Sequence, residues 1–172
     1  MTRAHIALIS TGGTIEKTYD ELEGVLSNKL SVLDVMLASL QLRGVHMSRV
    51  PLMNKDSLTM TDRDHTLIAR TAGAMAETHN GVIIVHGTDT LAITGERCHQ
   101  LLGADLKVPV VLTGAMRPYE LRSTDALQNL TESLLAVQLL EPGVYVVMHN
   151  QVLRFPGVVK DRDHGTFARM PD

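Results

Sequence analysis

Short apolar runs alternate with amphipathic segments along most of the chain. Five apolar runs rich in β-branched residues predict strands, at residues 5–10, 45–53, 82–85, 108–112 and 144–148. Between them, hydrophobic residues recur every three to four positions, and this spacing predicts helices over about 31–40, 61–78, 91–102 and 123–140. A further apolar stretch at 152–159 predicts one or two edge strands, because Pro156-Gly157 interrupts it.

The alternation of buried strands with amphipathic helices decides the fold class. A continuous apolar strand is typical of a parallel sheet that is covered on both faces, and helices supply the right-handed crossovers between its strands. We therefore predict an α/β fold with three layers: a doubly wound, mostly parallel sheet with helices on both faces. No linker or repeat divides the sequence, so we expect a single domain over residues 1–172.

Composition and charge exclude several classes of protein. The chain has 16 Lys plus Arg against 19 Asp plus Glu, a net charge of -3 that gives no basic excess for nucleic acid. Cys98 is the single cysteine, which rules out an internal disulfide. The start MTRAHIALIS lacks a signal peptide, and no apolar run is long enough for a membrane helix. We expect a cytoplasmic protein that binds neither nucleic acid nor membrane.

Three predicted strands end in turns of similar composition. Thr11-Gly12-Gly13-Thr14 follows the first strand, Gly87-Thr88-Asp89-Thr90 the third, and Thr113-Gly114-Ala115-Met116-Arg117-Pro118 the fourth. Ligands of parallel sheets bind at the carboxyl ends of the strands, so these turns predict one site. Taken singly, Thr14 and Thr88 are also consistent with ordinary helix N-caps. The convergence of three such turns favours function.

Two kinds of ligand fit these turns poorly. The sequence Thr-Gly-Gly-Thr-Ile has neither of the two glycine patterns that cradle nucleotide phosphates. The tracts Asp62 to His65 and Asp161 to His164 contain possible metal ligands, but no two histidines have helical ligand spacing, and Asp62 and Asp64 are explained as acids in the first turn of a helix. We therefore predict no nucleotide and no metal.

A hydroxyl nucleophile fits the turns better. A threonine needs a neighbouring base before it can attack an acyl carbon at neutral pH. The chain offers Thr14 and Thr88, an acid beside the second in Asp89, Tyr19 on the loop after the first, and Lys160 after the last apolar stretch. A lysine and a carboxylate next to a threonine would favour loss of its proton.

Three stretches of the chain resemble the L-asparaginase family of threonine amidohydrolases: LISTGGTIE at 8–16, VHGTDT at 85–90 and LTGAMRP at 112–118. The resemblance implies hydrolysis of the side-chain amide of L-asparagine to L-aspartate and ammonia, through an acyl-enzyme on a threonine and without a cofactor. It also implies little activity on glutamine and a homo-oligomer, a dimer or a tetramer, which the apolar face of the helix over 127–140 supports.

The resemblance assigns roles to individual residues. Thr14 matches the nucleophile, and Gly13 lets the substrate approach the backbone. Thr88 and Asp89 match the second threonine, whose backbone N–H lies in the oxyanion hole, and the acid that contacts the substrate's α-amino group. Lys160 matches the lysine that pairs with this acid.

Further positions match the family with less central roles. Ser57 is the candidate contact for the substrate α-carboxylate, and the carbonyl of Ala115 is the candidate contact for the scissile amide. Tyr19 matches a catalytic tyrosine of the lid, although it lies only five residues after Thr14. The matching Met116, Arg117 and Asp125 we interpret as structural support.

One departure concerns length. The longer enzymes add a C-terminal domain, and we expect this chain to be a short form that has only the N-terminal type of domain. Two alternatives stay open: an ammonia-supplying subunit, as in tRNA-dependent amidotransferases, and a non-catalytic module that binds an amino acid.

Overall fold

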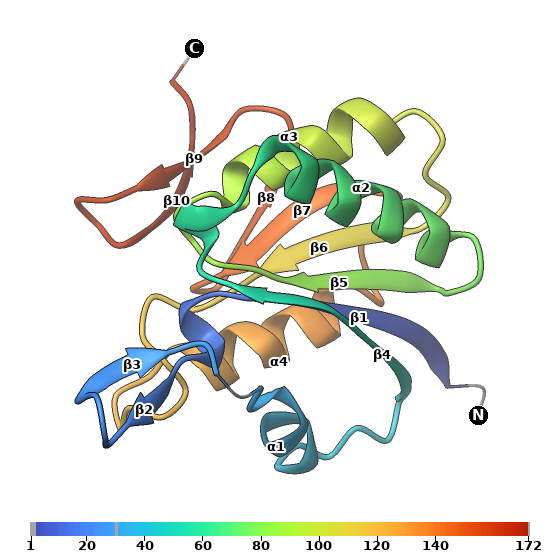
Figure 1. Ribbon diagram of the computed structural model, residues 1–172. Helices are drawn as coiled ribbons and strands as arrows, with labels where there is room; N and C mark the ends of the chain where they lie inside the picture. The colour runs from blue at the N-terminus through green and yellow to red at the C-terminus, as the bar shows by residue number, and fades with distance from the viewer. Residues whose placement is uncertain (1–2, 30, 172) are drawn as a thin grey trace.

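A computed structural model describes residues 3–29 and 31–171. Its centre is a six-stranded sheet in the order β4-β1-β5-β6-β7-β8 (Figure 1). The first five strands are parallel, and β8 runs antiparallel at the edge. The strands are β1 (Ala4–Gly12), β4 (Val45–Lys55), β5 (Gly81–Val85), β6 (Pro109–Thr113), β7 (Gly143–Met148) and β8 (Gln151–Arg154).

Helices cover both faces of this sheet (Figure 1). One face packs against α2 (Asp62–Ala76) and α3 (Leu91–Leu102), and the other against α1 (Leu33–Ala38) and α4 (Ala126–Ala136). Alternate residues of β1 divide between the two cores, since side chains along a strand point to opposite faces. The predicted three-layer, mostly parallel α/β fold is confirmed.

The helix ends show where local signals suffice. Thr61 and Asp64 form the expected capping box of α2, in which each side chain accepts a hydrogen bond from the backbone N–H of the other residue. The prediction for α4 was too long at its start, because the Thr124 hydroxyl donates to the Arg117 carbonyl (2.9 Å) and holds this segment as a turn. At the other end, Leu139 is exposed beyond the helix.

Two hairpins differ from the sequence-based prediction. β2 (Thr18–Asp20) pairs with β3 (Val25–Ser27) inside the segment that was expected to be a polar loop. β9 (Val158–Asp161) does not join the edge of the main sheet, because it pairs with β10 (Thr166–Arg169), which was not predicted. Both hairpins lie on the side of the molecule where the parallel strands end (Figure 1).

The strand order sets the position of the site. β1 lies between β4 and β5, so the chain leaves the sheet in opposite directions on the two sides of β1. Such a switch point leaves a crevice at the carboxyl ends of the strands. Short 3-10 helices, η1 (Thr14–Glu16) and η2 (Ser57–Thr59), follow β1 and β4 there.

Two further expectations concern surfaces. The leucines of α4 that suggested an oligomer mostly pack on this chain's own sheet, and Leu135 is the one within the helix that is exposed. Among the described residues, no helix is both long and apolar enough to cross a membrane.

Candidate active site

The loops after β1 and β5 meet at two glycines. Gly13 has φ 84° and ψ -177°, a conformation that only glycine adopts readily. A Cβ atom on Gly13 would lie 2.4 Å from both Cα and N of Gly87, so the two backbones are in direct contact. The predicted site residues Thr14 and Thr88 each follow one of these glycines. The structure therefore brings together the first two of the three predicted turns.

Ser57 lies against Gly87. A Cβ atom on Gly87 would be 2.6 Å from both Cβ and Oγ of the buried Ser57. The Thr90 hydroxyl also donates to the Ser57 carbonyl (3.0 Å), which ties η2 to the turn after β5. The loop after β4 thus joins the same site, as the candidate role of Ser57 requires.

A lysine, a hydroxyl and a carboxylate form the most polar cluster of the site. Lys160 Nζ donates to Thr88 Oγ1 (2.9 Å) and to Asp89 Oδ1 (2.8 Å). The Lys160 and Asp89 side chains are only 16% and 27% exposed, so solvent weakens this ion pair little. The hydrogen bond from Lys160 is the main reason that the pKa of Asp89 is lowered. Asp89 is therefore a carboxylate at neutral pH, held beside a threonine hydroxyl.

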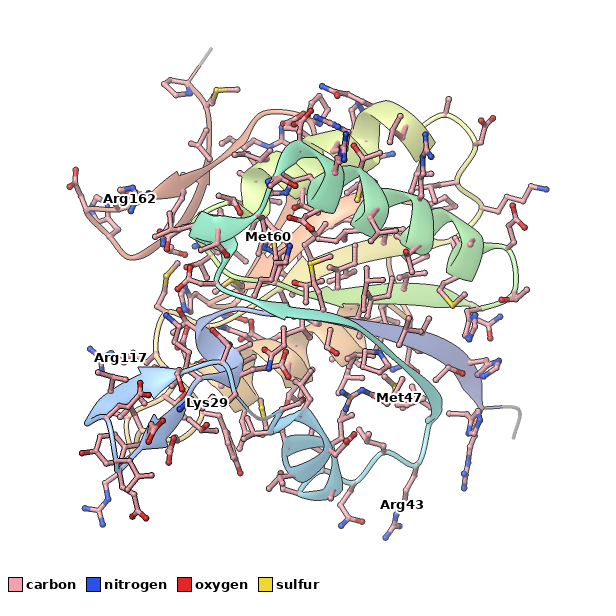
Figure 2. The ribbon with its side chains drawn as sticks, viewed as in Figure 1. Lys29, Arg43, Met47, Met60, Arg117 and Arg162 are labelled. Atoms are coloured by element: carbon pink, nitrogen blue, oxygen red, sulfur yellow. The ribbon has the colours of Figure 1, made fainter. Side chains whose placement is uncertain are left out.

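Arg162 is a second cation near Asp89, and no motif of the sequence predicts it there. Its Nη1 lies 3.3 Å from Asp89 Oδ1, and its side chain extends from the β9–β10 hairpin (Figure 2). Because this side chain is 69% exposed, water and salt screen its charge far more than that of Lys160.

The β9–β10 hairpin reaches the site because it is fixed to α3. The Gly157 N–H donates to Glu96 Oε1 (2.6 Å), and Val158 and Phe167 are buried in the core on the α3 side. The Phe155 ring fills the space above Gly95, where a Cβ atom would lie 2.1 Å from the ring. These contacts hold Lys160 next to a turn that is 71 residues earlier in the chain.

The loop after β6 closes the site from a third side. A Cβ atom on Gly114 would lie 2.3 Å from the His86 carbonyl oxygen and 3.4 Å from Thr88 Cγ2. Asn129 Nδ2 donates to the Gly114 carbonyl (2.9 Å), which anchors this loop to α4. Ala115 is buried next to this contact, so all three predicted turns converge.

Asp125 supports the loop after β6. It accepts hydrogen bonds from the backbone N–H groups of Met116 and Arg117 (both 3.0 Å) and from His149 Nε2 (2.6 Å). Burial alone would raise the pKa of Asp125, but these donors outweigh burial and lower it. The three residues interpreted as structural support are placed accordingly.

Neither predicted nucleophile candidate is a helix N-cap. Gly13 caps η1 and Thr90 caps α3, in both cases without a side-chain hydrogen bond. The capping interpretation of Thr14 and Thr88 is therefore wrong. Thr14 is only partly buried, whereas Thr88 is buried.

Tyr19 lies apart from the polar cluster. It was expected on a loop, but it belongs to β2, where it pairs with Leu26. Its side chain is 57% exposed, and its backbone N–H donates to the Glu120 carboxylate. Within the described residues, no hydrogen bond joins the Tyr19 hydroxyl to another predicted site residue.

Two buried polar residues around the site were not predicted. Glu16 is buried and accepts hydrogen bonds from the Gly12 N–H (3.1 Å) and the Ser31 hydroxyl, while burial raises its pKa. His86 is also fully buried, directly before the turn after β5. A polar residue that ends an otherwise apolar strand was the available signal for His86. Glu16 had no such signal.

Metal ligands do not gather at this site. In residues 3–29 and 31–171, no group of three or more His, Cys, Asp or Glu side chains is placed to hold a metal ion.

The comparison with known proteins agrees with the fold and the motifs. The family profile described as "Asparaginase, N-terminal" matches residues 5–167. An L-asparaginase of Thermococcus kodakarensis is 30% identical over 150 residues, which are 86% of this chain and 45% of that protein. A glutamyl-tRNA(Gln) amidotransferase subunit of Methanobrevibacter smithii is 31% identical over 153 residues, which are 88% of this chain and 35% of that protein.

A solved structure extends this likeness to three dimensions. The thermostable L-asparaginase from Thermococcus kodakarensis superposes with a TM-score of 0.86 at 28% identity, over 96% of this chain and 51% of that one. The chain thus spans about half or less of the length of these proteins.

Proposed function

The chain belongs to the asparaginase family, and we propose that it hydrolyses the side-chain amide of L-asparagine to L-aspartate and ammonia. The observation that carries the proposal is the cluster in which Lys160 donates to both Thr88 and Asp89, at the point where Gly13 and Gly87 touch. This cluster combines a proton-transfer group, a hydroxyl and a carboxylate at the carboxyl ends of the parallel strands.

The proposed reaction has two steps. In the first, Thr14 Oγ1 attacks the amide carbon, its proton passes to the leaving nitrogen, and the C–N bond breaks, so that ammonia departs and a threonine ester remains. In the second, water attacks the ester, which releases aspartate and restores the Thr14 hydroxyl. Lys160, Asp89 and Thr88 assist the proton transfers, and the Thr88 N–H stabilises the oxyanion. Tyr19 is kept as a candidate that would have to move toward Thr14.

Substrate recognition is proposed at the same ends of the parallel strands. Asp89 binds the substrate's α-amino group as a carboxylate, which agrees with its lowered pKa and the hydrogen bond from Lys160. Ser57 binds the α-carboxylate, Gly13 lets the substrate lie against the backbone, and the Ala115 carbonyl accepts from the scissile amide. A compact pocket rejects one extra methylene by about 1–3 kcal/mol, so glutamine is a poor substrate.

Ammonia release from asparagine and from glutamine tests the proposal. We expect the wild-type chain to release ammonia from asparagine, Thr14→Ala to abolish release, and Thr14→Ser to retain part of it, because serine keeps the hydroxyl. Thr78→Ala, in the exposed turn between α2 and the amino end of β5, is the matched control and should leave the rate unchanged. A folded wild-type chain that binds asparagine without releasing ammonia would instead support a non-catalytic amino-acid-binding module.

A second candidate function is an ammonia-supplying subunit of a larger complex. The likeness to a protein named as part of a glutamyl-tRNA(Gln) amidotransferase favours it. This function requires a stable partner, so purification of the tagged chain from its own cells should recover a second protein in equal amount. Recovery of the chain alone would leave the asparaginase proposal as the better one.

The remaining expectations are part of the proposal. We infer a single domain of the N-terminal type, a homo-oligomer with a dimer as its smallest unit, and a cytoplasmic location. Equilibrium sedimentation tests the dimer directly: a mass of about one chain at micromolar concentration would refute it.

A further inference from the structure

A chain of hydrogen bonds runs through the core to the floor of the proposed site. It begins at His65 of α2, whose Nδ1 lies 2.7 Å from the hydroxyl of Thr94 of α3. The same hydroxyl lies 2.7 Å from Nε2 of His86, and Nδ1 of His86 lies 2.7 Å from the Gly87 carbonyl oxygen. All three side chains are buried, so water does not compete for these bonds.

The direction of each hydrogen bond follows from its end point. A carbonyl oxygen only accepts, so Nδ1 of His86 carries a proton and donates to Gly87. Burial lowers the pKa of His86 to about 4, so Nε2 carries no proton at neutral pH and accepts from the Thr94 hydroxyl. This hydroxyl has one proton, so it must in turn accept from Nδ1 of His65. All the donors therefore point the same way, toward Gly87.

The chain of hydrogen bonds ends at the peptide bond between Gly87 and Thr88. The carbonyl and the N–H of a peptide are coupled by resonance, so a hydrogen bond to the carbonyl makes the N–H more polar. Within residues 3–29 and 31–171, the Thr88 N–H donates to no backbone or side-chain acceptor. This donor belongs to a buried residue in the turn between β5 and α3. A donor that no protein group occupies is available to a ligand.

We propose that the chain from His65 through Thr94 to His86 polarises the Gly87–Thr88 peptide and thereby strengthens the Thr88 N–H as a donor to the developing oxyanion. This inference rests on the proposed function, in which the Thr88 N–H stabilises that oxyanion. His65, Thr94 and His86 are positioning residues, because they act on the substrate only through this peptide. Mutual satisfaction of buried polar groups alone would give the same direction, but it would not require the peptide at the end of the hydrogen-bond chain to have an open N–H.

Thr94 offers the sharpest test because substitution by valine or by serine separates the effect of side-chain shape from that of the hydrogen bonds. Thr94→Val keeps the shape and removes the hydroxyl, whereas Thr94→Ser keeps the hydroxyl. Cooperative strengthening is about 10–30% per bond, and an oxyanion donor contributes roughly 10²- to 10³-fold to kcat. The Thr94 hydroxyl acts on the Thr88 N–H through two successive bonds, so we expect Thr94→Val to lower kcat for asparagine by up to about 2-fold with KM unchanged. Thr94→Ser should have the wild-type kcat, because serine keeps the hydroxyl.

A matched control removes packing on the same helix. Cys98, one turn after Thr94 on α3, is buried without a place in the hydrogen-bond chain. Cys98→Ala should lower the melting temperature without lowering kcat. If Thr94→Val and Cys98→Ala lower kcat equally, or if Thr94→Val leaves kcat at the wild-type value, the proposal is overturned.

A readout that needs no catalysis separates this inference from the proposed function. The proton chemical shift of the Thr88 amide should move upfield in Thr94→Val, return in Thr94→Ser and stay in place in Cys98→Ala. If the wild-type chain hydrolyses no amide, the proposed function fails, and this shift still decides whether the peptide is polarised. An unmoved shift in Thr94→Val overturns the polarisation.

His65 provides a second variant in case Thr94→Val does not fold. His65→Leu removes only the first donor and keeps the bond between Thr94 and His86. We expect the Thr88 amide proton to move upfield by less than in Thr94→Val. An unmoved Thr88 amide in His65→Leu overturns the proposed polarisation.

Discussion

Replacing Gly13 by alanine tests whether the contact between the first two turns holds the site together. At φ 84° and ψ -177° a non-glycine residue is strained by about 1–3 kcal/mol. The new Cβ would also lie 2.4 Å from the Gly87 backbone, and relief of such crowding costs typically about 1–3 kcal/mol. Both effects act on the folded chain alone, so we expect the free energy of unfolding to fall by about 4 kcal/mol.

Thermal unfolding followed by circular dichroism measures this loss. For a chain of this size, about 1 kcal/mol corresponds to roughly 2–4 °C in Tm, so the expected drop is about 8–16 °C. Gly24→Ala is the matched control: Gly24 has φ 68° in an exposed turn with no atom within 4 Å of a new Cβ. Gly24→Ala introduces backbone strain without crowding, so its free energy of unfolding should fall by only about 1–2 kcal/mol.

The amide hydrolysis assay completes this test. Gly13→Ala should lose activity below its melting temperature, because separation of the two backbones displaces both Thr14 and Thr88. Gly24→Ala should keep it. A Tm for Gly13→Ala within error of the Gly24→Ala value, together with full activity, would refute the close contact.

Other predictions concern titratable side chains that are buried or partly buried. Lys160→Met should abolish amide hydrolysis and lower the free energy of unfolding by about 1–3 kcal/mol at pH 7. Since the folded pKa of Asp89 lies below its usual 3.8, the stabilisation it contributes is present above that pH and is lost as the pH falls through the folded pKa. Urea midpoints of wild type and Lys160→Met should therefore converge in acid, and a constant gap would contradict the ion pair. Glu16→Ala should cost about 1–3 kcal/mol by leaving the Gly12 N–H without an acceptor, whereas Glu16→Gln keeps one. Because burial raises the pKa of Glu16 above its usual 4.5, wild type should gain stability relative to Glu16→Gln as the pH falls, and thermal unfolding at pH 7 and pH 4 checks the sign. Asp125→Ala leaves two backbone N–H groups of the loop after β6 unpaired, so we expect a loss of at least about 2 kcal/mol in urea unfolding, and wild-type stability would contradict its supporting role.

Local and periodic signals were sufficient for the sheet and its helices. β5 consists mainly of β-branched residues, and every residue in it is buried, as a central parallel strand requires. The start of α2 followed from Thr61 and Asp64 because a capping box involves only residues three positions apart. These interactions are encoded within one segment, so the sequence alone predicts them.

The two hairpins could not be predicted in the same way. β2 and β3 are three residues each, too short for an alternation of apolar and polar side chains to be recognised. β9 leaves the main sheet because Val158 and Phe167 pack into the core on the α3 side, and nothing local in the sequence fixes that choice. A short strand takes its place from tertiary contacts more than from its own pattern.

The candidate site also has features encoded within single segments and features that depend on tertiary contacts. The three turns that combine glycine with threonine could be assigned to one edge because parallel strands all end there. The order of the strands was needed to place Ser57 against Gly87, because that contact depends on β4 and β5 lying on either side of β1. Lys160 was a candidate because of its residue type and its place after the last apolar stretch, and the resemblance gave it a role. Its contact with Thr88 could not be predicted from spacing, since its hairpin reaches Thr88 across 72 positions of the chain.

The hydrogen-bond chain beneath the site shows why polar residues in the core are the hardest to interpret. His65, Thr94 and His86 come from three different segments, and none has a distinctive spacing to the others. Each alone would be an expensive group to bury without a partner. Packing of α2 on α3 brings the three within hydrogen-bond distance, so each satisfies the next and the last donor is directed at Gly87. A buried polar residue next to a functional turn is therefore best interpreted from the direction of its hydrogen bonds, because burial alone does not distinguish a group that merely fills the core from one that acts on the backbone of the site.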